Sequence, residues 1–334
     1  MPNPPRKHHF VQAAHIEQFI NAGGTLSVYS KNGEDFPGTP KSIFKKRDLN
    51  SFVSPDGLDT SFENFVTKRE NISFPAIKRI SLKREISLED LPLVIAYLSL
   101  SLIRNPTVQI GVVELHRLCA VASAKIMDKN GMFGIPPESL GQGKSMADLI
   151  DEGILDFDIN NIVYLKYFSE MIEAVFRVLI GGFKWSLLQS PSGNVAISDH
   201  PLTFLTPGMD YRAYGIPMGG QNCEIAFPIS KHLYLIGRWG DPFQNSDSEL
   251  AVEQLNMRQA VFANRQVASS EPNSIIKGLV SNYCAIGFQS KANGIEMGDG
   301  TPIMLRRGVF PLTQCSTVNC YEFMREVVPL SRLL

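Results

Sequence analysis

The first half of the chain has the periodicity of helices. Between about residues 58 and 180, apolar residues recur every three or four positions, as on the buried face of a helix. We expect one helix from about Leu58, interrupted near Pro75 because proline lacks an amide donor. A second is expected to begin at Ser87 as its N-cap and to end before Pro106, and a third to cover Val108–Lys129.

A fourth helix is expected over residues 159–180. Almost all of its positions are apolar, which predicts a central helix that is packed around most of its circumference. Its charges fall at spacings of four, three and four and therefore share one narrow stripe. They either form ion pairs along the only wet face, which is the favoured interpretation, or line a cleft; these residues are Lys166, Glu170, Glu173 and Arg177.

The N-terminal region and the second half have the pattern of strands. TLSVYSKNGEDFPG contains an alternating strand and the turn signal Asn32-Gly33, and KSIFKKRDL is the expected partner strand. FKWSLLQ, PSGN and VAIS together predict a β-hairpin, and CEIAFPIS and HLYLIGRW predict two more strands. A helix is expected over residues 248–268 and a strand in the tail from Ile303. The fold class is therefore α+β.

Length and composition predict one large domain. The chain has 334 residues, 44% of them hydrophobic, with no internal repeat or low-complexity linker. We expect a single α+β domain over residues 1–334, with two packed lobes: 1–182 mainly helical, and 183–334 β-rich with a late helix. The net charge of −1 argues against a protein that coats nucleic acid or membrane, although a local basic groove remains compatible with it. The most basic stretch, Lys41–Arg47, is interpreted as a solvated strand or loop.

Cysteine usage and hydropathy favour a cytoplasmic protein without membrane contact. The five cysteines form no CxxC pair, which fits a reducing compartment, and the N-terminus has no apolar leader. The apolar stretch Leu91–Ile103 is shorter than the roughly 20 residues that a membrane span needs. Ile162–Ile180 is long enough, but it contains four charges.

Candidate chemistry starts with the histidines near the N-terminus. His8, His9 and His15 fall within eight positions, and imidazole titrates near neutrality and is the commonest metal ligand. Because adjacent residues point in different directions on a strand or helix, His8 and His9 are expected to play different roles. A histidine pair in a loose terminal arm is the simpler alternative.

Acidic residues and one arginine supply further candidates. Asp199 follows a predicted strand, where it either projects into a cleft or caps nearby amides in a turn. Glu63 and Glu70 are seven positions apart and share a helix face, so that with Asp199 and a histidine they could hold a divalent metal. Arg104 ends an apolar helix, where it either satisfies the last carbonyls, the interpretation we favour, or binds an anion. Phosphate-loop, HExxH, GxSxG and GxGxxG signatures are missing.

Taken in order, several motifs resemble the bacterial domain-of-unknown-function family number 4238. HHFV, Phe19 and SVYSKNG resemble its opening, and the later motifs follow in the same order: Glu63 and Glu70, LIRNP, KW at 184–185, SDHP at 198–201, FPIS at 227–230 and LN at 255–256. The resemblance spans roughly residues 7–270. Gln12, Ala13 and His200 depart from the usual proline, glutamine and asparagine, and His15 is not a matching position. The matching positions are His8, His9, Glu63, Arg104, Ser198 and Asp199.

The family has no assigned reaction, but the resemblance implies that the His-His and SDxP motifs meet in one site. The leading hypothesis is a metal-dependent phosphoesterase, in its most concrete form a nuclease in bacterial defence or mobile elements. In it His8, His9, Asp199 and Arg104 are catalytic, and Glu63, Asp199 and His9 bind Mg²⁺ or Mn²⁺. The expected partners are nucleic acid or a phosphorylated small molecule. The alternative is a non-catalytic binding or assembly module, in which the same polar residues fix the N-terminal arm onto the β half.

Overall fold

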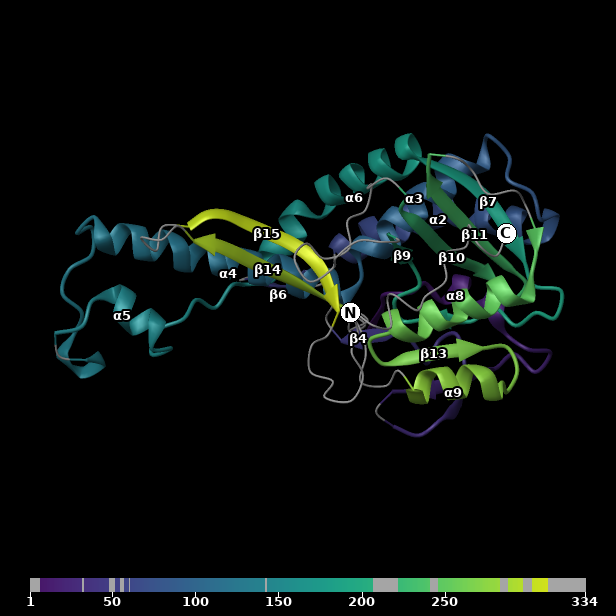
Figure 1. Cartoon of the computed structure of the whole chain (residues 1–334), viewed down its shortest axis with the longest axis horizontal. Coiled ribbons are helices and arrows are strands. Elements are labelled where there is room, and N and C mark those ends of the chain that lie inside the picture. Colours follow the sequence, from purple (N-terminus) through teal and green to yellow (C-terminus); the bar gives the residue numbers. More distant parts are fainter. Residues whose placement is uncertain are drawn as a thin grey trace.

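The computed structural model describes residues 7–31, 33–47, 52–54, 57–59, 61–141, 143–206, 222–240, 246–282, 288–296 and 302–311. These residues form an α+β fold, as the sequence predicted, in which a long arm projects from a larger body (Figure 1). The N-terminal half is mainly helical, and most strands of the body come from the C-terminal half.

A five-stranded sheet is the centre of the body, with the order β12-β7-β11-β10-β9. Its pairs are antiparallel except for β12 with β7. Successive side chains point to opposite faces, so Leu235 packs with the helices on one face while Ile236 packs into a second core on the other. Burial on both faces explains the nearly continuous apolar runs of its strands. The strands are β7 (Phe183–Gln189), β9 (Thr203–Leu205), β10 (Glu224–Ser230), β11 (Leu233–Trp239) and β12 (Ser246–Asp247).

Three helices cover the first face of this sheet: α2 (Ser61–Lys83), α3 (Asp90–Ile103) and α6 (Ile162–Gly182). The middle one is α3, which contacts both of the others. The Ser87 hydroxyl accepts a hydrogen bond from the backbone N–H of Asp90 at 3.0 Å, as a cap would, although α3 begins at Asp90 and its N-cap position is Glu89.

A second sheet and helix α8 (Glu249–Phe262) lie against the other face. This sheet has the order β3-β2-β13-β8, and α9 (Ser274–Asn282) packs on it from outside. Because β2 pairs with β13, the two halves of the chain share one sheet. The strands are β2 (Leu26–Ser30), β3 (Phe36–Gly38), β8 (Ile197–Ser198) and β13 (Gln266–Ser269).

The N-terminal segment consists of three short elements. It forms β1 (Lys7–His9), α1 (Ala13–Ile16) and a 3₁₀ turn, η1 (Glu17–Phe19). β1 pairs antiparallel with β4 (Lys45–Arg47), which places His9 opposite Lys45. A separate ribbon joins β5 (Phe52–Ser54) to β6 (Gly57–Asp59).

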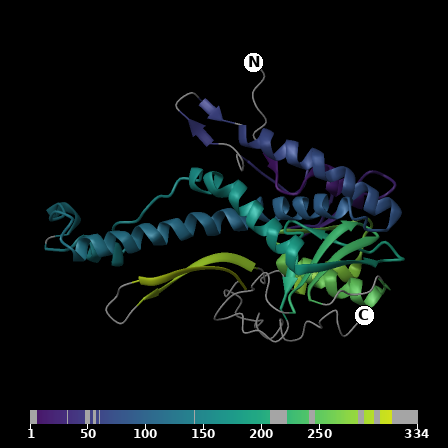
Figure 2. The same ribbon diagram turned by 90° about the horizontal axis from the view of Figure 1, so that it is seen from above.

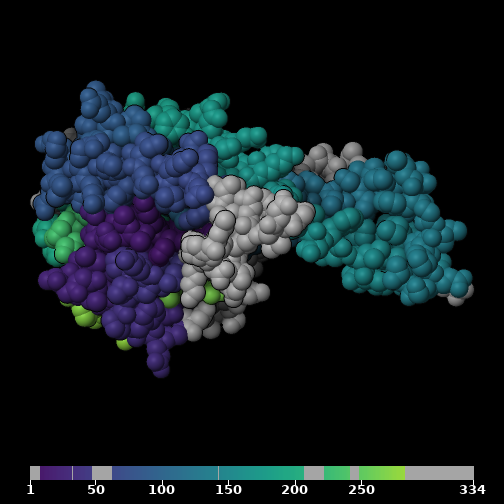
Figure 3. All heavy atoms as spheres, turned by 180° about the vertical axis from the view of Figure 1, so that it is seen from behind, coloured from purple at the N-terminus to yellow at the C-terminus, as the bar shows by residue number. Residues whose placement is uncertain are grey.

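The arm is built on the long helix α4 (Pro106–Lys129), which begins where the Asn105 side chain caps the backbone N–H of Thr107. The hairpin β14 (Phe288–Glu296)–β15 (Pro302–Pro311) runs alongside α4 (Figure 2). The far end carries η2 (Glu138–Leu140) and α5 (Met146–Asp151), and it stands clear of the body in Figure 3. In the described part of the chain, no single helix is long and apolar enough to cross a membrane; α3 and α4 pass that test only as a pair bent by 58°.

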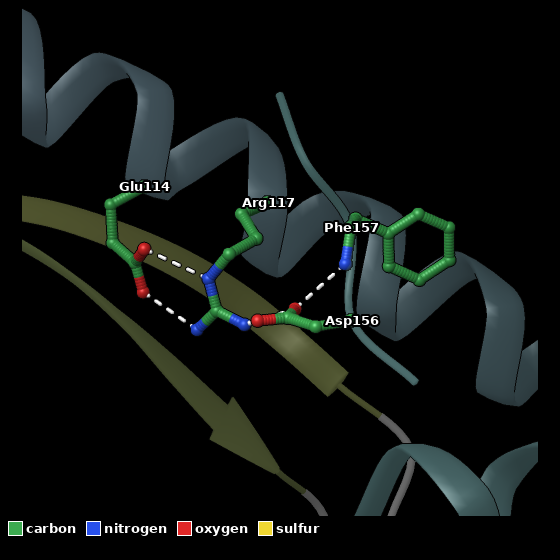
Figure 4. Close-up of polar contacts among 4 residues, drawn as sticks. All are labelled: Glu114, Arg117, Asp156 and Phe157. Atoms are coloured by element: carbon green, nitrogen blue, oxygen red, sulfur yellow. Dashed lines mark hydrogen bonds and ion pairs between the residues drawn. The ribbon is translucent and has the colours of Figure 1, made fainter. Parts of the chain in front are cut away.

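Ion pairs attach the end of α5 and the segment that follows it, residues 151–157, to α4. The Arg117 guanidinium donates to both oxygens of Glu114, at 2.9 and 2.8 Å, and to Asp156 at 2.7 Å (Figure 4). Asp156 also accepts from the backbone N–H of Phe157 at 2.7 Å. Lys125 adds a second link, to Asp151 at 2.6 Å.

Two helix predictions are wrong in detail. Helix α2 continues through Pro75 without interruption, since tertiary packing of its apolar face outweighs the loss of one amide donor. Helix α6 is not central. It lies at the side of the helix layer, and its buried positions form a single stripe: Tyr164, Phe168, Ile172, Val175 and Leu179. The sandwiched helix is α3.

Two strand pairings and the end of one helix were also predicted wrongly. β7 and β8 do not form a hairpin, because the chain passes between them from one sheet to the other. β4 pairs with β1 and not with β2, whose hairpin partner is β3. The late helix ends at Phe262, and residues 266–269 form β13. A turn signal indicates where a chain reverses but does not specify the partner strand. The predicted turn residue Asn32 lies outside the described residues.

Candidate functional site

A buried ion-pair cluster links helices α2 and α3 to the N-terminal strand β1. Arg104 follows the last turn of α3, and its side chain is 2% exposed. Its guanidinium pairs with Glu70 and lies 3.6 Å from Glu63. The Nδ1 atom of His8 lies 3.3 Å from the other oxygen of Glu63. The sequence predicted that Glu63 and Glu70 share a face of α2, and the structure confirms it.

Burial shifts the pKa values of acidic groups in and beside this cluster. Desolvation raises the pKa of Glu70, although the neighbouring Arg104 opposes the shift. Desolvation also raises the pKa of Tyr97, whose ring lies in the core beside the cluster. The Arg104 guanidinium therefore compensates the charges of two glutamates inside the protein. The sequence had suggested that it caps helix carbonyls or binds an anion from solvent.

The two adjacent histidines have different surroundings, as their neighbouring strand positions predicted. His8 is buried and pairs with Glu63, whereas His9 is only partly buried. Desolvation, Arg104 and Lys45 lower the pKa of His9, so its imidazole is neutral at pH 7. The histidines thus belong to an ordered strand and not to a loose arm.

Asp199 lies outside the ion-pair cluster. Its carboxylate accepts hydrogen bonds from three successive backbone N–H groups, of Asn264 at 2.7 Å, Arg265 at 2.8 Å and Gln266 at 3.2 Å. Burial raises its pKa to about 6 against the lowering effect of these bonds. Of the two roles open from the sequence, the carboxylate thus caps a turn, the one that leads into β13. Its own backbone carbonyl accepts from the Asn105 amide at 3.0 Å, beside the start of α4.

The other residues of the SDHP turn are also buried. The Ser198 hydroxyl donates to the Gln259 side chain at 2.7 Å, which fixes β8 against α8. Burial lowers the pKa of His200 to about 4, and its Nδ1 lies 3.0 Å from the carbonyl oxygen of Leu202. His15, which the resemblance had set aside, is a core residue that stacks on Phe227.

The predicted metal-binding set is not brought together. Among the described residues, no group of three or more histidine, cysteine, aspartate or glutamate side chains could hold a metal ion. Glu63 pairs with His8 and Arg104, while Asp199 is occupied by backbone amides. The residues present therefore do not fit a Mg²⁺ or Mn²⁺ ion held by Glu63, Asp199 and His9.

The HHFV and SDHP motifs nevertheless each contribute one residue to the same cavity, although neither His8 nor His9 lines it. It has a volume of about 520 Å³ and lies between β4, the residue after β1, the start of α4 and the turn into β13. Phe10 and Asp199 contribute to its wall from the two motifs. The remaining lining residues are Ser42, Phe44, Lys45, Lys46, Pro106, Thr107, Ile110, Asn264, Arg265 and Gln266.

Sequence reasoning missed the cations of this cavity. Lys45 and Lys46 belong to the basic run Lys41–Arg47, which was interpreted as a solvated strand or loop. The run does include a strand, β4, and both lysines line the cavity. The basic run was the available signal. No local pattern singled out Arg265, which is brought there by the turn that Asp199 holds.

Fold and site together define an α+β protein with a buried ionic cluster beside a cationic cavity. The chain belongs to the family described as "Protein of unknown function (DUF4238)", whose family model matches residues 7–273. The hairpin β14–β15 follows the matched region. Neither the curated proteins nor the solved structures contain a match to this chain.

Proposed function

We propose that this protein binds a phosphate-bearing small molecule of nucleotide size in the cavity between β4 and the turn into β13. The observation that carries the proposal is the lining of that cavity. Lys45, Lys46 and Arg265 bring three cationic side chains to a space of about 520 Å³. Cavities of roughly 300–1,000 Å³ are typical of small-molecule sites.

The aromatic and acidic residues of the lining support the same ligand class. Phe10 and Phe44 lie with their ring centroids 6.5 Å apart and offer an apolar wall against which a base or another flat group can pack. Asp199 is the acidic residue of the lining, but its two oxygens are held by backbone N–H groups. An anionic ligand therefore meets the cations without an opposing free carboxylate.

The ionic cluster has a positioning role in this proposal. His8 ties β1 to α2 through Glu63, and β1 is paired with the strand that carries Lys45 and Lys46. Asp199 likewise fixes the turn that carries Arg265. The polar residues predicted as catalytic would then hold the walls of the cavity in place.

Calorimetric titration with adenosine monophosphate, inorganic phosphate and adenosine tests this proposal. We expect the monophosphate to bind more tightly than either part alone. A K45A/K46A/R265A variant should lose affinity roughly ten-fold or more, because hydrogen bonds to charged groups each contribute about 1.5–3 kcal/mol. K184A is the matched control, since Lys184 is exposed on β7 outside the cavity. Equal affinity in the triple variant and the control would refute the proposal, and so would no binding of any of the three probes.

Hydrolysis of a phosphoester in the same cavity is a second candidate, favoured by His9. This residue lies next to Phe10 and opposite Lys45, both of which line the cavity, and its imidazole is neutral, as a general base must be. Its Nδ1 atom is buried and has no partner among the described residues, so the proton transfer requires water to reach that atom. DNA, RNA and small phosphodiesters should then be cleaved, and H9A should lose the activity while K184A keeps it. Lack of cleavage of all substrates, with Mg²⁺, with Mn²⁺ and without metal, would leave binding as the function.

A further inference from the structure

A second hollow, separate from the cationic cavity, lies between helices α2, α3 and α6. Its volume is about 530 Å³. Leu93 and Ala96 of α3 and Ile172 of α6 line it with apolar atoms, and Ile72 of α2 and Phe176 of α6 add two further apolar side chains. Ile72 is 64% exposed. We refer to this hollow as the helix groove.

Two of the charged side chains that line the helix groove contact other side chains of the protein. Glu173 pairs with Arg177 at 2.5 Å, as one of the two interpretations of the charged stripe predicted. The Arg69 guanidinium lies over the ring of Phe65, 4.6 Å from its centroid. Glu173 is therefore compensated by Arg177, whereas Arg69 keeps its positive charge over an aromatic ring.

Glu170 is different. The expected pair with Lys166 is not found among the described residues, since the Lys166 ammonium lies 5.8 Å over the ring of Tyr167 instead. Glu170 lines the groove and is exposed, with no ion-pair partner in the described part of the chain. The groove thus combines an apolar surface with two carboxylates, one of them unpaired, and one guanidinium among its described lining residues.

We propose that the helix groove binds a lipophilic cation, with its hydrocarbon part on Leu93, Ala96 and Ile172 and its ammonium group at Glu170. The apolar contact supplies most of the binding energy, at about 25 cal/mol per Å² of buried apolar area. The carboxylate supplies the selection for positive charge, because exposed charges contribute more to specificity than to affinity. The volume of the groove accommodates an eight-carbon chain with its head group.

Three probes with one tail length test the charge selection: octyltrimethylammonium, octanol and octanoate. Titration calorimetry at an ionic strength on the order of 0.01 M keeps electrostatic screening weak. We expect the cation to bind most tightly and octanoate most weakly. E170Q should weaken binding of the cation about three-fold or more and leave octanol unchanged. E85Q removes the same charge from an exposed position outside the groove and should change nothing.

Two variants locate the binding in the helix groove. A96F adds a ring to the lining of the groove and should abolish binding of the cation and of octanol. If A96F does not fold, I72K adds a positive charge at an exposed position and should weaken the cation selectively. The proposal is overturned if octanoate binds more tightly than the cation. It is also overturned if cation binding is unchanged both in E170Q and in the second variant, A96F or I72K. The nucleotide titration at the cationic cavity is independent of both results.

Discussion

Two arginines of this protein make similar contacts in opposite environments. Arg104 in the body and Arg117 in the arm each lie beside two carboxylates from different turns or segments of the chain. The Arg104 side chain is 2% exposed, whereas that of Arg117 is 31% exposed. The body cluster joins β1 and two helices, and the arm cluster attaches an exposed segment to α4.

The difference shows that the number of ion pairs does not measure their importance. At the arm, water and salt screen each charge, and side chains lose entropy when they are held in one geometry. In the body, the charges have already lost their hydration, so each depends on the others for compensation. Removing one partner should therefore matter far more in the body than in the arm.

The largest expected effect is that of R104M. It leaves Glu70 and Glu63 without their buried cation, and loss of one member of a buried pair typically costs about 3–5 kcal/mol. Urea unfolding followed by circular dichroism measures this loss. Adding E70Q to R104M should recover part of the stability, because it removes one of the uncompensated charges. A loss below about 1 kcal/mol for R104M would contradict the contrast between the two clusters.

Local patterns predicted part of the fold. Periodicity located α3, α4 and α6, and continuous apolar runs located β10 and β11, because both patterns depend only on neighbouring residues. Strand partners were predicted less well. The chain between β7 and β8 looks like a hairpin locally, yet the two strands belong to different sheets. Which sheet a strand joins depends on contacts between segments that are distant in sequence.

In the candidate site, too, features set by neighbouring residues were predictable and contacts between distant segments were not. The shared face of Glu63 and Glu70 and the separate roles of His8 and His9 follow from helix and strand geometry alone. The role of Asp199 does not, because its three N–H partners come from residues 264–266, far along the chain. The resemblance to a family implied that the His-His and SDxP motifs meet in one site, but it could not specify which side chains touch.

Burial also predicts different responses of the two regions to acid. Desolvation lowers the pKa of His15 and of His200 to about 4, below the ordinary histidine value of about 6.5. As the pH falls below 6.5, the unfolded chain takes up these protons first, so the body loses stability between pH 6.5 and about 4. In the arm, Arg117 lowers the pKa of Asp156, and its ion pair therefore persists at pH 5.

The variant H200N tests the acid response of the body. Between pH 6.5 and about pH 5, His15 and His200 each cost about 1–2 kcal/mol of stability. Asp199 offsets part of this loss, because its pKa is raised to about 6 and the folded protein takes up that proton first. With His200 replaced, His15 and Asp199 should nearly cancel. Urea unfolding at the two pH values should show a clearly larger fall for the unchanged protein than for H200N; equal falls would refute the assignment.

The smallest global effect should come from R117Q. This change removes the guanidinium that connects Glu114 to Asp156, but its partners remain hydrated, so the melting temperature should shift by less than about 2 °C. The local effect should be larger. Without Arg117, the segment around Asp156 opens more often from α4, and amide hydrogen exchange should speed up there while α3 stays protected. R177Q, which breaks an exposed pair within α6, is the control and should leave exchange in the arm unchanged. Faster exchange throughout the body of R117Q would mean that the arm cluster supports the whole fold, and the contrast with Arg104 would then fail.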